Sequence, residues 1–393
     1  MAMRFILFIS GTESFNYFSG KLTEELTKRH HEIFTLDLRD ASAPGPHSLT
    51  ALMNFMQAGT VQAAIGYDQM ATISQDFCDL WNEYHIPVIS IYMDPLYRFG
   101  AINRFRTDCS IRYCCDLNHV SFCRRYHHDT MPNVFFMPHA ASLPDTSIPW
   151  DQKKMNLLFS GTWYNPENYI QEIKNSGFEE STQDFLLTVI DFLKSYPHCS
   201  VDQAVERLLS EYYSSSDETV CCDMLEHCAP VDWYIRMYFR TKVIETIISS
   251  GQEIYLLGRG WENLPATSGK NVHILSDRVS FAESLRMMAQ ARINLNVMPW
   301  FKDGTHDRVF NTLLRDSAPL TDDSIWLREH LKENQDCFYY DLQNLEMLPS
   351  IIKDILDNPV KTAEVIRNGK KIVADNYIWK NLVDQLEADI TQF

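Results

Sequence analysis

The stretch DGTHDRVFNTLLRDSAPLTDD, residues 303–323, decides the fold of this chain. It follows a short apolar run at 293–297, which predicts a buried strand. A polar Gly-Thr loop comes next, then the start of a helix, and then the apolar pair Pro319-Leu320. Strand, loop and helix in this order are typical of a parallel α/β sheet, whose ligands bind at the carboxyl ends of the strands.

The same unit occurs at the start of each half of the chain. Residues 4–10 are an apolar run that ends at Gly11, and residues 156–160 are another that ends at Gly161. Short apolar runs then alternate with segments of helical spacing, which predicts α/β architecture with parallel sheets covered on both faces. The remaining predicted strands are 32–38, 61–66, 87–93, 109–115, 134–138, 253–257 and 272–275.

The length of 393 residues predicts two domains. The stretch 140–154 contains Pro144 and Pro149 among small polar residues, as linkers do. We therefore expect a first domain at 1–145 and a second at 146–375. The second contains a helical insertion at about 165–230, and residues 376–393 form a last helix that crosses back to the first domain.

Composition and charge restrict the function. The net charge is −17 without any basic run, which argues against nucleic acid and against anionic membrane surfaces as partners. No apolar stretch approaches the ~20 residues that span a bilayer, and the N-terminus has the character of a strand, without the cleavage site of a signal peptide. Ten cysteines without a secretion signal predict free thiols in the cytoplasm. A phosphate-bearing small molecule needs only a few local donors.

The local chemistry of the 303–323 segment suits an anion. Gly304 and Thr305 precede the helix, so backbone N–H groups there have no partner within the helix. His306 and Arg308 add donors, and Asn311 lies one turn further on, within reach of a ribose diol. The alternative interpretation is a capped helix that carries a solvated histidine and arginine.

The pattern strand, GTHDRVFN, helix, APLTD resembles the signature of the group 1 glycosyltransferases, and in particular their CgeB-like branch of spore-maturation proteins. Residues 156–390 carry the resemblance, and the first half carries it in general pattern. It implies a GT-B fold, in which two Rossmann-like domains face a central cleft. It also implies a hexosyltransferase-type enzyme that moves a sugar from a nucleoside diphosphate, expected to be UDP (uridine diphosphate), to a protein or glycan acceptor.

The resemblance assigns roles to particular residues. Asp303 and His306 are the catalytic candidates of the second half, and His139 is that of the first half, where a structural histidine at the hinge is the alternative. The donor-binding candidates are Gly161, Thr162, Arg240, Lys242, Gly260, Trp261, Gly304, Thr305, Arg308 and Asn311. Helix N-termini and basic side chains would stabilise the diphosphate, so the resemblance implies no metal and no cofactor besides the donor, with retention of configuration.

Two positions depart from the family pattern. Asn311 stands where the family has a glutamate that binds the ribose, and Asp316 stands where it commonly has glycine. These departures motivate an alternative function, a weakened nucleotide-sugar-binding scaffold that assists a partner.

Other site types have weaker support. Gly258-Arg259-Gly260 is only a fragment of a dinucleotide fingerprint, and no P-loop motif occurs. The cysteines at 109, 114, 115 and 123 with His127, and those at 221, 222 and 228, lack the spacing of a zinc site, so we expect buried thiols.

Overall fold

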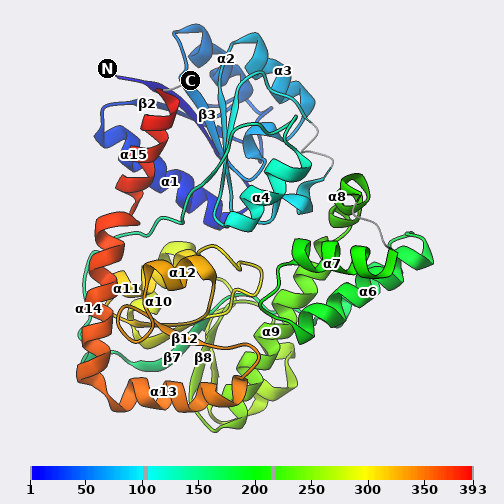
Figure 1. Cartoon of the computed structure of the whole chain (residues 1–393). Coiled ribbons are helices and arrows are strands. Elements are labelled where there is room, and N and C mark those ends of the chain that lie inside the picture. Colours follow the sequence, from blue (N-terminus) through cyan, green and yellow to red (C-terminus); the bar gives the residue numbers. More distant parts are fainter. Residues whose placement is uncertain (1, 101–104, 214–216, 392–393) are drawn as a thin grey trace. The chain divides into compact units, whose positions relative to one another are not determined.

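The computed structural model describes residues 2–100, 105–213 and 217–391 and divides the chain into two units (Figure 1). The first unit consists of Met1–Ser142 together with Tyr377–Phe393, and the second of Leu143–Asn376. Each unit has a six-stranded parallel sheet of its own.

The sheet of the first unit has the strand order β2-β1-β3-β4-β5-β6, with the apolar residues of β1 and β3–β5 buried. The direction of succession reverses between β1 and β3, which makes this the topological switch point of the sheet. The strands are β1 Arg4–Ile9, β2 Glu32–Asp37, β3 Ala63–Tyr67, β4 Val88–Tyr92, β5 Ser110–Cys114 and β6 Val134–Phe136.

The helices of the first unit cover this sheet. Three of them begin at a side-chain cap, in which Ser48, Ser74 or Asp116 accepts a backbone N–H of the first turn. The helices are α1 Glu13–Lys28, α2 Leu49–Gln57, α3 Gln75–Glu83, α4 Leu117–Tyr126 and the C-terminal α15 Trp379–Ile390.

Helix α15 packs against α1, more than 350 residues away in sequence. Arg29 forms ion pairs with Glu387 at 2.6 Å and Asp384 at 2.7 Å. At the start of α15, the indole N–H of Trp379 donates to Ser142 Oγ at 2.9 Å. The last helix is therefore part of the first unit.

The sheet of the second unit has the order β12-β11-β10-β7-β8-β9. Its switch point lies between β7 and β10, the first and fourth strands of the unit, as in Rossmann sheets. The strands are β7 Met155–Ser160, β8 Ile254–Leu257, β9 Val272–Ile274, β10 Ala291–Asn296, β11 Ala318–Asp322 and β12 Phe338–Tyr340.

Ten helices accompany this sheet in the described residues. They are α5 Glu167–Lys174, α6 Glu180–Ser195, α7 Val201–Tyr213, α8 Glu218–Glu226, α9 Ala229–Ser249, α10 Phe281–Ala289, α11 Asp307–Leu314, α12 Ile325–His330, α13 Leu348–Asp357 and α14 Pro359–Asn376. Across 2–100, 105–213 and 217–391, no helix combines the length and apolar character needed to span a membrane.

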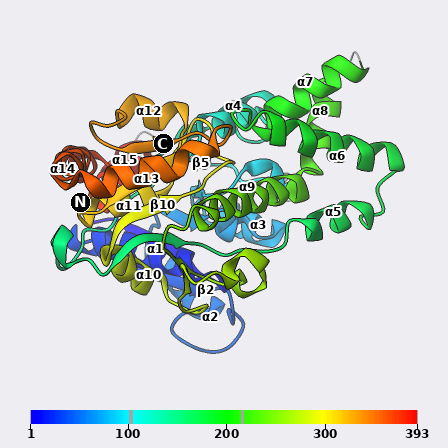
Figure 2. The same cartoon turned by 90° about the horizontal axis from the view of Figure 1, so that it is seen from below.

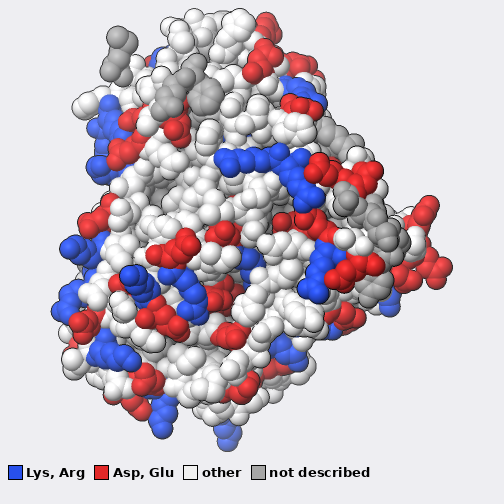
Figure 3. All heavy atoms as spheres, viewed as in Figure 1, with Lys and Arg blue, Asp and Glu red and all other residues white. Residues whose placement is uncertain are grey.

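Helices α5–α8 follow β7 and precede α9, and we call residues 167–226 the helical lobe. Helices α5 and α6 both pack on α9, and Figure 2 shows them extending beyond it. The lobe has 13 Asp and Glu residues but 3 Lys and Arg residues, so its net charge of −10 is more than half of the chain's net −17. Acidic side chains gather over this part of the surface in Figure 3.

Two glycines let the loops after β7 and β8 touch backbone to backbone. Gly258 and Gly260 have φ angles of +128° and +89°, which side-chain-bearing residues rarely adopt. A Cβ atom on Gly258 would lie 2.5 Å from the carbonyl oxygen of Gly161, and one on Gly260 would lie 2.0 Å from that of Trp163. The close approach fixes the loop that follows β7, which borders the switch point.

Candidate functional site

The candidate site lies at the carboxyl ends of β7 and β10, on either side of the switch point of the second sheet. Strand β7 ends at Ser160, and the loop after β10 carries Trp300. Helix α9 brings Arg236 and Arg240 to this edge, and α11 brings Arg308. Open parallel sheets bind their ligands at such a position.

Three arginines and two aromatic rings alternate across the site. The guanidinium carbons of Arg236 and Arg240 lie 4.1 and 5.4 Å from the ring centroid of Trp300. Those of Arg240 and Arg308 lie 5.9 and 5.6 Å from the ring centroid of Phe159. We call these five residues the arginine row. Cation–π contacts with the rings hold the like-charged groups near one another.

Arg240, at the middle of the row, has the least compensated charge. Burial, together with the positive charges of Arg308 and Arg236, lowers its pKa to about 9. Its Nη1 donates to the carbonyl oxygen of Thr162 at 2.7 Å, but in the described part of the chain it forms no ion pair. Arg236, in contrast, pairs with Asp232 at 2.8 Å. An anion would therefore stabilise the centre of the row.

Buried polar atoms beside the row also lack partners. Within the described residues, Ser160 Oγ, Arg240 Nε and Trp300 Nε1 are buried without a hydrogen bond to the protein. Buried polar groups are normally paired, because leaving one unpaired costs about 1–3 kcal/mol. All three atoms can donate, so the arrangement suits a ligand that has several acceptor oxygens.

His306 is the N-cap of α11. Its Nδ1 lies 3.2 Å from the backbone nitrogen of Arg308 and 2.9 Å from Asp307 Oδ1. A neutral ring serves one of these groups at a time, because Nδ1 either accepts from the former or donates to the latter. Burial and the charge of Arg308 lower the His306 pKa, which favours the neutral ring at pH 7. When Nδ1 caps the helix, Nε2 carries the proton and is a further donor.

Asn311 lies on the buried face of α11. Its Nδ2 donates to Asp307 Oδ2 at 3.1 Å, and its Oδ1 accepts from Arg315 Nη1 at 3.1 Å. The amide therefore joins an internal network that orients Asp307 at the start of the helix. Arg308 donates to Asn296 Oδ1 at the end of β10, which fixes the guanidinium at the site.

A carboxyl group lies at the end of the neighbouring strand β11, and its charge acts on Arg308. Asp322, at the end of β11, accepts the backbone N–H of Met298 at 2.7 Å through Oδ1. Burial raises its pKa to about 7, although the charge of Lys302 opposes the shift. Its Oδ2 has no hydrogen-bond partner among the described residues.

Several predicted donor-binding residues lie near the row but shape or support the loop after β7. Gly161 and Thr162 follow β7, and a Cβ on Gly161 would lie 3.8 Å from the guanidinium carbon of Arg240. Trp261 is fully buried and donates to the carbonyl oxygen of Gly161 at 2.8 Å, while Gly260 provides the close loop contact described above. The structure thus gives Trp261 a supporting position behind the loop.

The loop before α11 contains Asp303, Gly304 and Thr305. Thr305 is fully buried, Asp303 is partly exposed, and the carbonyl oxygen of Gly304 accepts from Ser324 Oγ at 2.6 Å. Lys242 does not join the row. Its side chain is half exposed on another face of α9 and lies 4.0 Å from Glu245.

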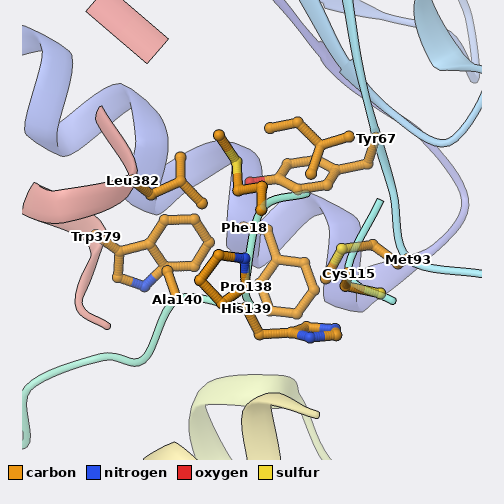
Figure 4. A pocket seen from close by; sticks show the side chains of 11 residues that line it. Phe18, Tyr67, Met93, Cys115, Pro138, His139, Ala140, Trp379 and Leu382 are labelled. Atoms are coloured by element: carbon orange, nitrogen blue, oxygen red, sulfur yellow. The ribbon is translucent and has the colours of Figure 1, made fainter. Parts of the chain in front are cut away.

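His139 belongs to the first unit, where it is buried beside a cavity (Figure 4). Among the cysteines expected to be buried, Cys109 and Cys222 are partly exposed, and the others are buried free thiols: Cys114, Cys115, Cys123, Cys221 and Cys228. In the residues that the structure describes, no group of three or more His, Cys, Asp and Glu side chains could hold a metal ion.

Sequence reasoning gave no role at the site to Ser160, Arg236, Trp300 or Asp322. Arg236 stands one helical turn before Arg240, so this spacing was a signal that both face the same side. Ser160 ends the predicted strand 156–160, which was a signal in the sequence, whereas Asp322 ends β11, which is not among the predicted strands. Trp300 gave no such signal, because its place follows from the path of the loop after β10.

Comparisons with known proteins agree with this architecture. A family described as "Glycosyl transferase-like" matches residues 240–388, which is less than half of the chain. No curated protein matches the sequence. Among solved structures, sucrose-phosphate synthase from Thermosynechococcus elongatus is similar with a TM-score of 0.59 and 10% identity, over 99% of this chain and 98% of that protein.

A second similar structure is HepE from Anabaena, solved in complex with UDP and glucose. Its TM-score is 0.51 at 10% identity, and the similarity covers 100% of both chains. HepE in complex with UDP-glucose gives the same TM-score at 11% identity and the same coverage. The predicted fold is therefore confirmed: the chain has the GT-B fold. The family match over residues 240–388 agrees with the predicted class of enzyme, a glycosyltransferase.

Proposed function

We propose that the chain transfers the sugar of a UDP-sugar donor to an acceptor hydroxyl, and that the arginine row binds the diphosphate of this donor. The observation that carries this proposal is Arg240, a buried guanidinium that forms no ion pair among the described residues. A diphosphate offers the negative charge and the acceptor oxygens that Arg240, Ser160 and Trp300 lack. The complexes of HepE with UDP and UDP-glucose support uridine as the nucleoside of the donor.

The row suits the departure of a diphosphate. In the reaction, the bond between the anomeric carbon and the diphosphate oxygen breaks, and the acceptor hydroxyl oxygen bonds to that carbon and loses its proton. Negative charge grows on the departing oxygen, and donors already oriented around it stabilise the transition state more than the ground state. Arg240 and Arg308 supply the positive charge that stabilises this oxygen. Neutral His306 adds an N–H donor when its Nδ1 caps α11.

Finer features belong to the same proposal. Because guanidinium groups provide the positive charge, we propose a reaction that requires no metal ion. Retention of configuration, a hexose as the transferred sugar, a protein or glycan acceptor and membership of the CgeB-like branch rest on the sequence resemblance. Asp303 and His306 remain the proposed catalytic residues of the second unit, and His139 that of the first.

The Asn311 network favours a second candidate, a nucleotide-sugar-binding scaffold. The amide is occupied by Asp307 and Arg315, whereas the family pattern has a carboxylate that binds the ribose. Turnover separates the two functions. Release of UDP from a UDP-sugar in the presence of acceptor supports the enzyme, and nucleotide binding without turnover across a panel of acceptors supports the scaffold.

The test of donor binding is an Arg240→Gln variant, measured by calorimetry with UDP. Hydrogen bonds to a charged group contribute about 1.5–3 kcal/mol, so we expect affinity to fall by about 10- to 100-fold. The matched control is Arg278→Gln in the same unit, because Arg278 is 83% exposed and lies 3.8 Å from Asp277. Unchanged affinity in Arg240→Gln would remove the row from the donor site.

A further inference from the structure

The first unit contains a small apolar cavity at the carboxyl edge of its sheet (Figure 4). Its walls come from α1, from the ends of β3, β4 and β5, from the segment after β6 and from α15. The side chains that line the cavity include Phe18, Tyr67, Met93, Met137, Trp379 and Leu382. The cavity belongs to the first unit alone, so it is separate from the arginine row.

One polar atom in this apolar wall has no partner. Tyr67 is 2% exposed, and its hydroxyl makes no hydrogen bond within the described residues. The ring is held by Phe15, which stacks on it at 5.8 Å, and by Phe18 at 5.5 Å. In Figure 4 the hydroxyl oxygen points into the cavity, toward the side formed by Leu382. A fixed, buried and unpaired hydroxyl is costly unless a ligand satisfies it.

Water is a poor occupant of this cavity. A buried water normally makes about three hydrogen bonds, and cavities with apolar walls stay dry and take up apolar ligands. Of the polar groups nearby, the indole N–H of Trp379 already donates to Ser142 Oγ. The imidazole of His139 lies at the edge of the cavity, in the view of Figure 4 below the ring of Phe18. Tyr67 would therefore be the main partner of a water there.

The position of the cavity also fits a ligand site. Tyr67 ends β3, which borders the switch point between β1 and β3. Open parallel sheets bind ligands outside the carboxyl ends of their strands at such a point. Met93 and Cys115 follow the ends of β4 and β5 along the same edge.

We propose that this cavity binds a short unbranched alkyl or acyl group of the acceptor, and that the Tyr67 hydroxyl hydrogen-bonds the oxygen atom that joins this group to the rest of the molecule. That the bound molecule is the acceptor rests on the proposed function; that the cavity binds such a chain does not.

The experiment titrates the full-length protein, without nucleotide, with n-alkyl β-D-glucosides from ethyl to hexyl. Methyl-labelled methionine gives the readout by NMR, because Met93 and Met137 line the cavity. We expect both methyl signals to shift and the dissociation constant to fall about fourfold for each added methylene, until the cavity is full. Affinity that does not depend on chain length, or unchanged Met93 and Met137 signals, would overturn the proposal.

Two variants separate the roles of the walls and the hydroxyl. Tyr67→Phe keeps the ring and its packing, so we expect affinity to fall about 2- to 10-fold for every glucoside while the gain per methylene stays. Ala140→Leu adds volume at the cavity wall, and we expect it to remove the gain per methylene. Equal affinities in Tyr67→Phe and the parent protein would exclude the hydroxyl, and a retained gain in Ala140→Leu would exclude the cavity.

The two proposals fail in different ways. If the glucosides bind with the expected chain-length dependence and UDP does not bind, the cavity site stands and the donor site falls. If UDP binds and chain length has no effect, the cavity proposal alone falls.

Discussion

Trp300 contacts two of the three arginines of the row, and its indole N–H is buried without a protein partner. The ring and the N–H are separable functions. The ring face attracts the guanidinium groups of Arg236 and Arg240, while the N–H is available to an oxygen atom of the donor.

A pair of substitutions tests these functions. Trp300→Phe keeps an aromatic face but loses the N–H, so we expect UDP affinity to fall about 2- to 10-fold, as loss of one neutral hydrogen bond predicts. Trp300→Leu also loses the cation–π contacts, so we expect a larger fall. Calorimetry with UDP measures both, and thermal unfolding without nucleotide controls for folding. Equal losses in the two variants would mean that the ring face contributes nothing, and unchanged affinity in Trp300→Phe would mean that the N–H takes no part.

At the scale of single residues, the sequence was informative where a motif is local. Arg308 and His306 lie in one continuous segment, so their common place at the start of a helix could be predicted from the sequence. The pairing states of Ser160 and Trp300 could not, because they depend on which atoms of distant segments approach them. The partners of Asn311 are local, but its burial follows from the packing of α11 against the sheet and α14.

Among the elements, the loops after β7 and β8 depend on particular glycines for their close contact. Gly258 and Gly260 allow these loops to cross at van der Waals distance, and this crossing supports Gly161, Thr162 and the indole of Trp261. The site thus depends on residues that touch no ligand.

Gly260→Ala should destabilise the second unit. The positive φ costs roughly 1–3 kcal/mol for alanine, and the new Cβ would lie 2.0 Å from the Trp163 carbonyl oxygen, so we expect a total loss above about 3 kcal/mol. Gly177→Ala is the matched control: its φ is +79°, but its Cβ would meet nothing within 4 Å. Thermal or urea unfolding measures both. Similar losses of unfolding free energy in the two variants would show that the contact between the loops does not contribute to stability.

Two strands show the limits of sequence patterns at the element scale. Residues 318–322 include Pro319, which argues against an interior strand, yet they form β11 between β10 and β12. Strand β12 has three residues, too few to show a periodicity, and the sequence did not predict it. Helix α9 begins at Ala229, within the range of the predicted helical insertion, and Pro230 fits its first turn.

For the molecule as a whole, the division into two units makes a prediction about stability. Each unit has its own sheet and core, and the arginine row lies in the second. UDP at 100 times its dissociation constant should stabilise the native second unit by about 2.7 kcal/mol.

Hydrogen exchange can locate this effect. Amides of β7 and β10 that exchange only through unfolding of the second unit should slow by about 100-fold. Amides in the core of the first unit, such as those of β1, provide the internal control and should keep their rates. Protection of the first unit without protection of the second would contradict a donor site on the arginine row.

The arginine row has a consequence for the steady state of the reaction. Guanidinium groups that stabilise a departing diphosphate hold the free nucleotide after transfer, because the charge that attracts it is still in place. Each time UDP leaves, the buried guanidinium of Arg240 again lies beside two other arginines without an anion to offset its charge. We therefore expect strong product inhibition, with nucleotide release limiting turnover, so that the cellular ratio of UDP-sugar to UDP would set how fast the enzyme works.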